Sequence, residues 1–213
     1  MADFDVIQRG SGGSTFEDLN QLIHPFAVQL APRAVVIWSG LNDIYNGATA
    51  DMVFGRYLRF TRTLNRLLPN TKIFFLGMTL NPSFAANAAQ NTERLNANTA
   101  IQNHVNTSGN ANLYYVDLPA YFENRPVGSS ASPLPGDLWA LFVDDKHMNR
   151  AGYDIWKTVI RQALVSGGVL ANRIPVANPL APAGGKRILF DFGPTDGTNG
   201  DPTTGPDERG NYW

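Results

Sequence analysis

The stretch Ala34-Val-Val-Ile-Trp-Ser-Gly-Leu-Asn-Asp43 decides the fold. Its first half is an unbroken run of apolar residues, most of them β-branched, which is typical of a strand buried on both faces of a parallel sheet. Its second half changes abruptly to Gly40-Leu-Asn-Asp43. Ligands of open parallel sheets bind beyond the carboxyl ends of the strands, so this change marks a candidate functional edge.

Apolar runs of this kind alternate with amphipathic segments along the chain. The alternation predicts a parallel α/β sheet with helices on both faces, a three-layer α/β/α architecture. The predicted strands are 5–8, 34–39, 72–78 and 113–117. Four helices are predicted. The first begins at a Ser14–Glu17 capping box and runs towards residue 22, and Pro25 is expected to disturb it. The others cover 50–68, 92–105 and the segment from the cap Asn149 to residue 164. Segments 81–91 and 119–143 are predicted loops.

Charge and composition exclude several classes of protein. The 213 residues contain 17 Lys plus Arg against 18 Asp plus Glu. This balance argues against a nucleic-acid binder that neutralises phosphates and against a basic membrane surface. The apolar runs are too short to cross a bilayer, so no transmembrane segment is expected. Cysteine is absent, which excludes disulfides, cysteine zinc sites and thiol nucleophiles.

A histidine and an aspartate before the last helix are the first candidates for chemistry. Taken alone, His147 fits a solvated loop residue in the charged run Asp144-Asp-Lys-His147. Asp144 could accept the imidazole N–H, fix its tautomer and stabilise the imidazolium, as the acid of a Ser-His-Asp triad does. Asp145 is the neighbouring alternative. His24 and His104 lie in predicted helices beside polar residues, where surface or half-buried positions are expected.

Two further candidates follow predicted strands. Asn42 could satisfy the backbone of a turn, or it could present its side-chain amide to a developing oxyanion. Gly13, at the end of Gly10-Ser-Gly-Gly13, could be an ordinary loop glycine. Alternatively, its backbone N–H could approach the same oxyanion, because no side chain stands in the way.

Together these motifs resemble the SGNH, or GDSL-type, hydrolase superfamily. Gly40-Leu-Asn-Asp43 matches its GxND block, and Asp144-Asp-Lys-His147 matches its DxxH block. Gln8-Arg-Gly-Ser-Gly-Gly-Ser-Thr15 matches its glycine block. The three blocks occur in order, and the likeness covers residues 4–165.

This resemblance implies a flavodoxin-like three-layer fold and the hydrolysis of esters. It makes His147 the general base, Asp144 its orienting partner, and the Gly13 N–H and Asn42 amide the oxyanion donors. It implies no metal and no organic cofactor. The implied partner is a small-molecule or carbohydrate ester substrate.

The family's Gly-Asp-Ser block, whose serine is the nucleophile, occurs nowhere in the chain. Ser11, Ser14 and Ser39 lie near the expected site, but none follows a strand in the family's context, so the nucleophile is expected outside this chain. The strand that carries it would lie between those bearing the glycine and GxND blocks. The sheet is therefore expected to be incomplete at its first strand, or circularly permuted with 186–192 in that place and Thr195 near the nucleophile's position.

The composition changes after the last helix. Residues 1–170 are predicted to form the hydrolase-like domain, and the proline-rich segment 171–185 a linker. Residues 186–213 are predicted either to complete the sheet or to begin a truncated β-sandwich module. Modules of that kind are often joined to exported carbohydrate-active enzymes, which favours a secreted or periplasmic parent protein and a carbohydrate ester.

Two other interpretations stay open. The loop 119–143, with Trp139 and Phe142, could line an acyl or sugar pocket or could pack over the edge of the sheet. A chain that keeps the oxyanion donors without a nucleophile also fits a non-catalytic carbohydrate- or ligand-binding protein derived from the same fold.

Overall fold

Three short parallel strands form the centre of the fold. The computed structural model describes residues 7–170 and pairs the strands in the order β1-β2-β3. Ile37 lies opposite Phe75, and Phe75 lies opposite Tyr115. Because the pairs are parallel, the carboxyl ends of the strands meet at one edge of the sheet. The strands are β1 (Ala34–Ile37), β2 (Lys72–Leu76) and β3 (Leu113–Val116).

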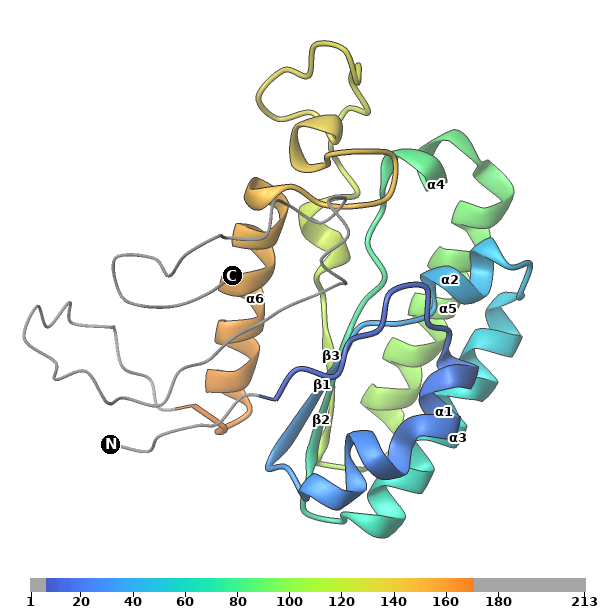
Figure 1. The fold of residues 1–213 in the computed structure, drawn as a ribbon, viewed down its shortest axis with the longest axis vertical. Helices are drawn as coiled ribbons and strands as arrows, with labels where there is room; N and C mark the ends of the chain where they lie inside the picture. The colour runs from blue at the N-terminus through green and yellow to red at the C-terminus, as the bar shows by residue number, and fades with distance from the viewer. Residues whose placement is uncertain (1–6, 171–213) are drawn as a thin grey trace, which may run out of the picture. The chain divides into compact units, whose positions relative to one another are not determined.

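Helices cover both faces of this sheet. Figure 1 shows α6 on one face and α1, α3 and α5 on the other. This arrangement confirms the predicted α/β fold with a parallel sheet between helices. The helices are α1 (Phe16–Phe26), α2 (Leu41–Tyr45), α3 (Ala50–Leu67), α4 (Pro82–Ala86), α5 (Ala88–Thr107) and α6 (Arg150–Ser166), with the 3-10 turns η1 (Val28–Leu30), η2 (Pro119–Tyr121) and η3 (Trp139–Leu141).

The central strand β2 is buried along most of its length. Ile73, Phe74, Phe75 and Leu76 are each exposed by 1% or less. A strand with neighbours on both sides and helices on both faces needs apolar residues at consecutive positions, and β2 has them. Within residues 7–170, no helix combines the length and apolar character that a membrane crossing needs.

The helices α3 and α6 follow the sequence patterns that predict them. In α3, Val53, Tyr57 and Leu64 recur at helical spacing and are buried. The α6 helix begins after Asn149, whose side chain accepts from backbone N–H groups of the first turn. Where α6 meets the sheet, Trp156 packs edge-on against Trp38, with 4.6 Å between ring centroids.

The start of α1 corrects the predicted capping box by one residue. Thr15, not Ser14, caps the helix, because Thr15 Oγ1 accepts from the Asp18 N–H and Asp18 Oδ2 accepts from the Thr15 N–H. Both registers fit the capping pattern in the sequence. Asn42 donates to the Ser14 carbonyl and Asp43 accepts from the Phe16 N–H, and both contacts fit a helix that is capped by Thr15.

Pro25 does not end α1 early. The helix continues to Phe26 and keeps Pro25 in its last turn. A proline removes one helical hydrogen bond and crowds the preceding turn, and both effects are smallest at a terminus.

Two short helices occupy segments where none was predicted. After β1, Gly40 adopts a left-handed φ of +110°, and α2 follows it directly. After β2, Asn81 caps α4 and Pro82 is its first residue. Asn87 then caps α5, so the prediction of a loop over 81–91 is wrong.

The predicted strand 5–8 is not formed in its described half. Ile7 and Gln8 lie in no strand, and residues 5 and 6 lie outside the described residues. The predicted linker 171–185, the extension 186–213 and the permuted strand 186–192 with Thr195 also lie outside them. Residues 7–170 therefore contain three strands rather than the four predicted up to residue 165, and β1 forms an edge of their sheet.

Candidate active site

Asp144 and His147 lie together in a tight loop between η3 and α6. The loop is closed by an antiparallel bridge between Phe142 and Met148 and by a hydrogen bond from the Val143 N–H to the His147 carbonyl. Asp144 Oδ1 accepts from the His147 backbone N–H at 2.6 Å, and Asp144 Oδ2 lies 2.7 Å from His147 Nδ1. The carboxylate therefore holds both the backbone and the ring of His147.

The pKa of the Asp144 carboxyl is lowered from its ordinary value of 3.8. Partial burial is the largest influence and acts in the opposite direction. The hydrogen bonds from the His147 ring and from the backbone N–H groups of His147 and Lys146 together outweigh it. The carboxylate can only accept, so Nδ1 carries the hydrogen of this bond, and Nε2 is the ring nitrogen that faces away from Asp144.

Asn42 and the turn at Gly13 form a second polar pair. Asn42 lies in the first turn of α2, and its Nδ2 donates to the Ser14 carbonyl at 3.0 Å. Because a carbonyl can only accept, this contact fixes which end of the Asn42 amide faces it. The amide nitrogen carries two hydrogens, so one remains for a ligand.

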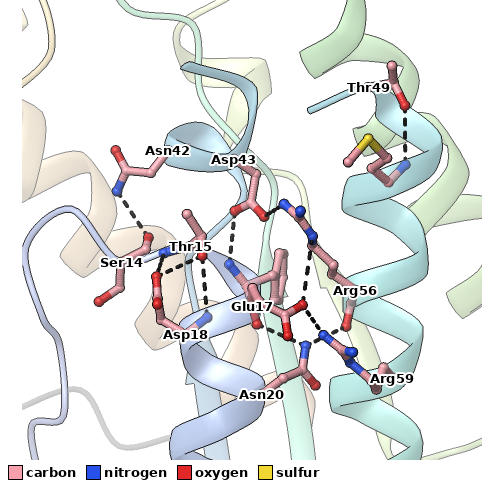
Figure 2. A network of polar contacts seen from close by, with 12 residues as sticks. Ser14, Thr15, Glu17, Asp18, Asn20, Asn42, Asp43, Thr49, Arg56 and Arg59 are labelled. Atoms are coloured by element: carbon pink, nitrogen blue, oxygen red, sulfur yellow. Dashed lines mark hydrogen bonds and ion pairs between the residues drawn. The ribbon is translucent and has the colours of Figure 1, made fainter. Parts of the chain in front are cut away.

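Gly13 has a left-handed conformation that suits a glycine. Its φ is +76°, and it is exposed. Among the residues that the structure describes, no partner takes up its backbone N–H. The Asn42 amide contacts the carbonyl of Ser14 (Figure 2), and Ser14 directly follows Gly13 in the chain.

A buried aspartate to which the sequence analysis gave no role supports this pair. Asp43 is 0% exposed; its Oδ2 accepts from the Phe16 N–H at 2.9 Å and its Oδ1 from Arg56 Nη1 at 2.6 Å. Figure 2 shows Asn42 and Asp43 reaching the start of α1 from neighbouring positions of α2. Two residues of α2 therefore hold the segment that follows Gly13: Asn42 contacts Ser14, and Asp43 contacts Phe16. The available signal was the position of Asp43 directly after Asn42 at a strand end.

Both pairs lie at the carboxyl edge of the sheet. Asn42 is on α2, which follows β1, and the His147 loop is bonded to α4, which follows β2. This bond runs from the Ser83 N–H to the Asp145 carbonyl, at 2.9 Å. Among the described residues, the two pairs are joined through such neighbouring contacts and not by a direct hydrogen bond between His147 and Asn42.

The other histidines lie elsewhere. His24 is exposed near the end of α1. His104 packs against the rings of Phe54 and Tyr57, and burial lowers its pKa, helped by the charge of Arg62. These positions agree with the surface or half-buried places expected for them.

The loop 119–143 contributes at least one core residue. Phe142 is 6% exposed and packs edge-on against Phe122, which favours packing over pocket lining for this residue. Trp139 is half-buried in η3. Within residues 7–170, no group of three His, Asp or Glu side chains is placed to hold a metal ion.

A cavity of about 430 Å³ lies at the opposite edge of the sheet. Arg33 precedes β1 and Lys72 opens β2, so this cavity is at the amino ends of the strands. It contains none of the candidate residues. His147 and Asn42 lie instead at the carboxyl edge, where ligands of parallel sheets bind.

Comparisons with known proteins add a family and a fold. A family model described as the GDSL-like Lipase/Acylhydrolase family matches residues 1–155. A comparison with curated proteins finds no match.

The fold is similar to that of several solved structures. One is a GDSL-like lipase from Bacteroides thetaiotaomicron, 20% identical over 75% of each chain, with a TM-score of 0.59. Another is a catalytic mutant of an acetylxylan esterase from Geobacillus stearothermophilus, 17% identical over 79% of this chain and 74% of that one, with a TM-score of 0.60. A third is a carbohydrate esterase family 3 protein from Talaromyces cellulolyticus, 18% identical over 72% and 68% of the two chains, with a TM-score of 0.56.

Proposed function

Because the chain belongs to the GDSL-like lipase/acylhydrolase family, we propose that it is an ester hydrolase that works by a Ser-His-Asp mechanism. One observation carries the proposal. Asp144 Oδ2 lies 2.7 Å from His147 Nδ1, and this leaves Nε2 of the same ring to exchange protons with a substrate. Such an arrangement suits a general base.

The proposed reaction begins when a serine hydroxyl attacks the ester carbonyl. His147 Nε2 takes the serine proton, and Asp144 stabilises the imidazolium that results. The second hydrogen of the Asn42 amide and the Gly13 N–H donate to the oxyanion of the tetrahedral intermediate. His147 then returns the proton to the leaving alcohol, and water releases the acyl group in a second round of the same steps.

We assign the serine to a segment outside this chain. The sequence contains no Gly-Asp-Ser block. Within the described residues β1 pairs with β2 alone, so the other side of β1 offers backbone groups to a further strand. A strand added there would end next to Asn42, which is where the mechanism needs the hydroxyl. The alternative is a circularly permuted fold, in which strand 186–192 takes this place and Thr195 lies near the nucleophile's position.

We favour a carbohydrate ester as the substrate. An acetylxylan esterase and a carbohydrate esterase family 3 protein are among the proteins of similar fold. This support concerns the class of substrate and leaves the acyl group and the alcohol to experiment.

Hydrolysis of p-nitrophenyl acetate tests the function. The assay compares this chain with a longer protein that restores the upstream part of its parent reading frame, each with its His147→Ala variant. Activity that requires both the upstream part and His147 is the expected result. Inactivity of the longer protein, despite a Gly-Asp-Ser block within it, would overturn the proposal.

The same assay tests the serines of the chain itself. Activity of the bare chain would move the nucleophile to Ser11, Ser14, Ser39 or Thr195. Ser14 deserves inclusion because Thr15, and not Ser14, caps α1. Single alanine substitutions would then identify the residue by complete loss of activity.

The second candidate function is a non-catalytic carbohydrate- or ligand-binding protein. It is favoured by the presence of Asn42 and Gly13 in a chain without the family's nucleophile block. Titration calorimetry with an acetylated xylooligosaccharide separates the two functions. Binding without release of acetate, in both the chain and the longer protein, would favour the binding protein.

A further inference from the structure

The loop that carries His147 completes the first turn of α4. Backbone N–H groups at the start of a helix have no partner inside the helix. In α4, Asn81 Oδ1 accepts from the Phe84 N–H at 2.9 Å, and the Asp145 carbonyl accepts from the Ser83 N–H at 2.9 Å. The Asn81 cap comes from the residue next to the helix, whereas the Asp145 carbonyl comes from the His147 loop. The hydrogen bond from Ser83 therefore ties this loop to α4.

A tyrosine ties α4 to α2. Tyr45 donates to Asn81 Oδ1 at 3.1 Å and accepts from Asn81 Nδ2 at 2.8 Å. Its ring also stacks on Phe84, with 4.5 Å between centroids and 13° between planes. Asn81 is 2% exposed and Phe84 is 0% exposed, so this connection is largely shielded from water. Burial raises the pKa of the Tyr45 hydroxyl, which keeps it a donor at neutral pH.

The same tyrosine also touches the His147 loop. Lys146 Nζ lies over the Tyr45 ring, 5.1 Å from its centroid. A cation over an aromatic face is attracted by the ring's quadrupole. Tyr45 is thus held by α4 and by the residue next to His147.

We propose that Tyr45 is a positioning residue that fixes the His147 imidazole relative to the Asn42 amide. Tyr45 ends α2, one helical turn after Asn42, so the two residues move as one rigid piece. Tyr45 joins this piece to α4 through Asn81 and to the His147 loop through Lys146. The inference rests on the proposed function, since it concerns how the general base and an oxyanion donor of that site are held in register.

The test uses nuclear magnetic resonance of the full chain at rest. Two signals report the geometry: the imidazole nitrogens of His147 and the side-chain amide of Asn42. Tyr45→Phe removes the two hydrogen bonds to Asn81 and keeps the ring that Phe84 and Lys146 contact. Tyr121→Phe is the matched control, because Tyr121 is exposed in η2.

We expect Tyr45→Phe to shift both reporter signals and to speed exchange of the His147 backbone amide by about tenfold, the size of effect that a lost hydrogen bond gives. Tyr121→Phe is expected to leave both signals in place. Equal spectra for the two variants would overturn the inference. If Tyr45→Phe does not fold, Asn81→Asp serves instead, since it keeps the Oδ1 acceptor for Phe84 and loses the Nδ2 donor to Tyr45.

A second pair of variants tests the contact with Lys146. Lys146→Met is expected to shift the Asn42 amide signal, whereas Lys146→Arg keeps the cation and is expected to restore it. Lys157→Met, on the exposed face of α6, is the control. An Asn42 signal that responds equally to Lys146→Met and Lys157→Met would contradict coupling through Tyr45.

Kinetics of the longer protein separate this inference from the proposed function. Tyr45→Phe is expected to lower kcat about tenfold with little change in KM, because the substrate contacts remain while the base is displaced. The resting spectra need no turnover. A protein that shows the spectral shifts but hydrolyses no ester would therefore refute the hydrolase and leave the positioning role in place.

Discussion

At the scale of single residues, the hydrogen bond between Asp144 and His147 dominates the candidate chemistry. The sequence predicted this contact, because a carboxylate three residues before a histidine in a loop can accept from its ring, but it left Asp145 as the neighbouring alternative. The contact between Asn42 and Ser14 was beyond such prediction. It joins residues 28 positions apart, and only the tertiary contacts between α2 and the start of α1 bring them together.

Asp144→Asn should remove most of the activity of the longer protein. An amide can no longer stabilise the imidazolium and can favour the wrong tautomer of His147, and such a change in a Ser-His-Asp triad costs about 10³- to 10⁴-fold in kcat. The rate of p-nitrophenyl acetate hydrolysis measures this loss of kcat. Asp145→Asn is the matched control, because the Asp145 contact to α4 uses its backbone carbonyl. A larger loss for Asp145→Asn would reverse the assignment.

The lowered pKa of Asp144 predicts how its contribution to stability depends on pH. The folded state binds the Asp144 proton more weakly than the unfolded chain does, so the contribution is present above the unfolded value of about 4 and is lost as the pH falls through the lower folded value. Urea unfolding of the chain and of Asp144→Asn should therefore differ most at neutral pH and converge below about pH 4. A difference that grows in acid would contradict the lowered pKa.

Asp43 and Glu17 provide a contrast between a buried and an exposed ion pair. Asp43→Ala leaves the Phe16 N–H without its partner and Arg56 without its counter-charge, and is expected to lower the free energy of unfolding by about 2–4 kcal/mol. Arg59→Ala breaks an exposed ion pair with Glu17 and should change the free energy of unfolding by about 0.5 kcal/mol or less. Urea unfolding measures both. Equal effects would show that Asp43 does not anchor α1.

At the scale of elements, the sequence predicted what local patterns determine. The long helices α3 and α6 have apolar residues at helical spacing over several turns, and the strands β2 and β3 are runs of apolar residues. The five-residue helices α2 and α4 are too short for such a pattern. Their positions depend on tertiary contacts such as that between Tyr45 and Asn81. The capping box shifted because Ser14–Glu17 and Thr15–Asp18 fit the same motif.

Two glycines predict opposite effects of the same substitution. Gly55 lies in α3, and a methyl group added there meets no atom within 4 Å. Gly55→Ala should therefore raise the free energy of unfolding by about 1 kcal/mol, since alanine favours the helix. A methyl group on Gly77, after β2, would lie 2.6 Å from Pro119 Cδ and still nearer the Tyr115 hydroxyl. Gly77→Ala should lower stability by about 1–3 kcal/mol.

Thermal or urea unfolding of the two glycine variants checks both signs in one experiment. The pair controls for the general effect of adding a methyl group, because only the surroundings differ. Destabilisation by Gly55→Ala would indicate that the exposed side of α3 is covered in solution.

At the scale of the whole molecule, the predicted strand 5–8 is the main departure from the predicted sheet, because Ile7 and Gln8, its described half, lie in no strand. Four strands were predicted up to residue 165, and the described residues form three. Sequence patterns identify strands one at a time, whereas the order of strands and the completeness of a sheet depend on pairings between distant segments. The parallel order β1-β2-β3 follows from the alternation of strands and helices, but the partner on the other side of β1 does not.

Hydrogen exchange tests whether a further strand pairs with β1. In a parallel strand, alternate backbone N–H groups point to opposite neighbours. In this chain we expect slow exchange for those β1 amides that face β2 and fast exchange for the others. In the longer protein with its upstream segment, the second set should become slow as well. Unchanged exchange would place the added segment elsewhere and remove the support that β1 gives to the proposed nucleophile.

The edge-on contact between Trp38 and Trp156 has a practical consequence. Trp38 directly follows β1, four positions before Asn42, and Trp156 lies in the helix that follows His147. The fluorescence of these two tryptophans should therefore report how α6 packs against the sheet. It allows the docking of α6 against the sheet to be followed in real time, without any label and before a substrate for the protein is identified.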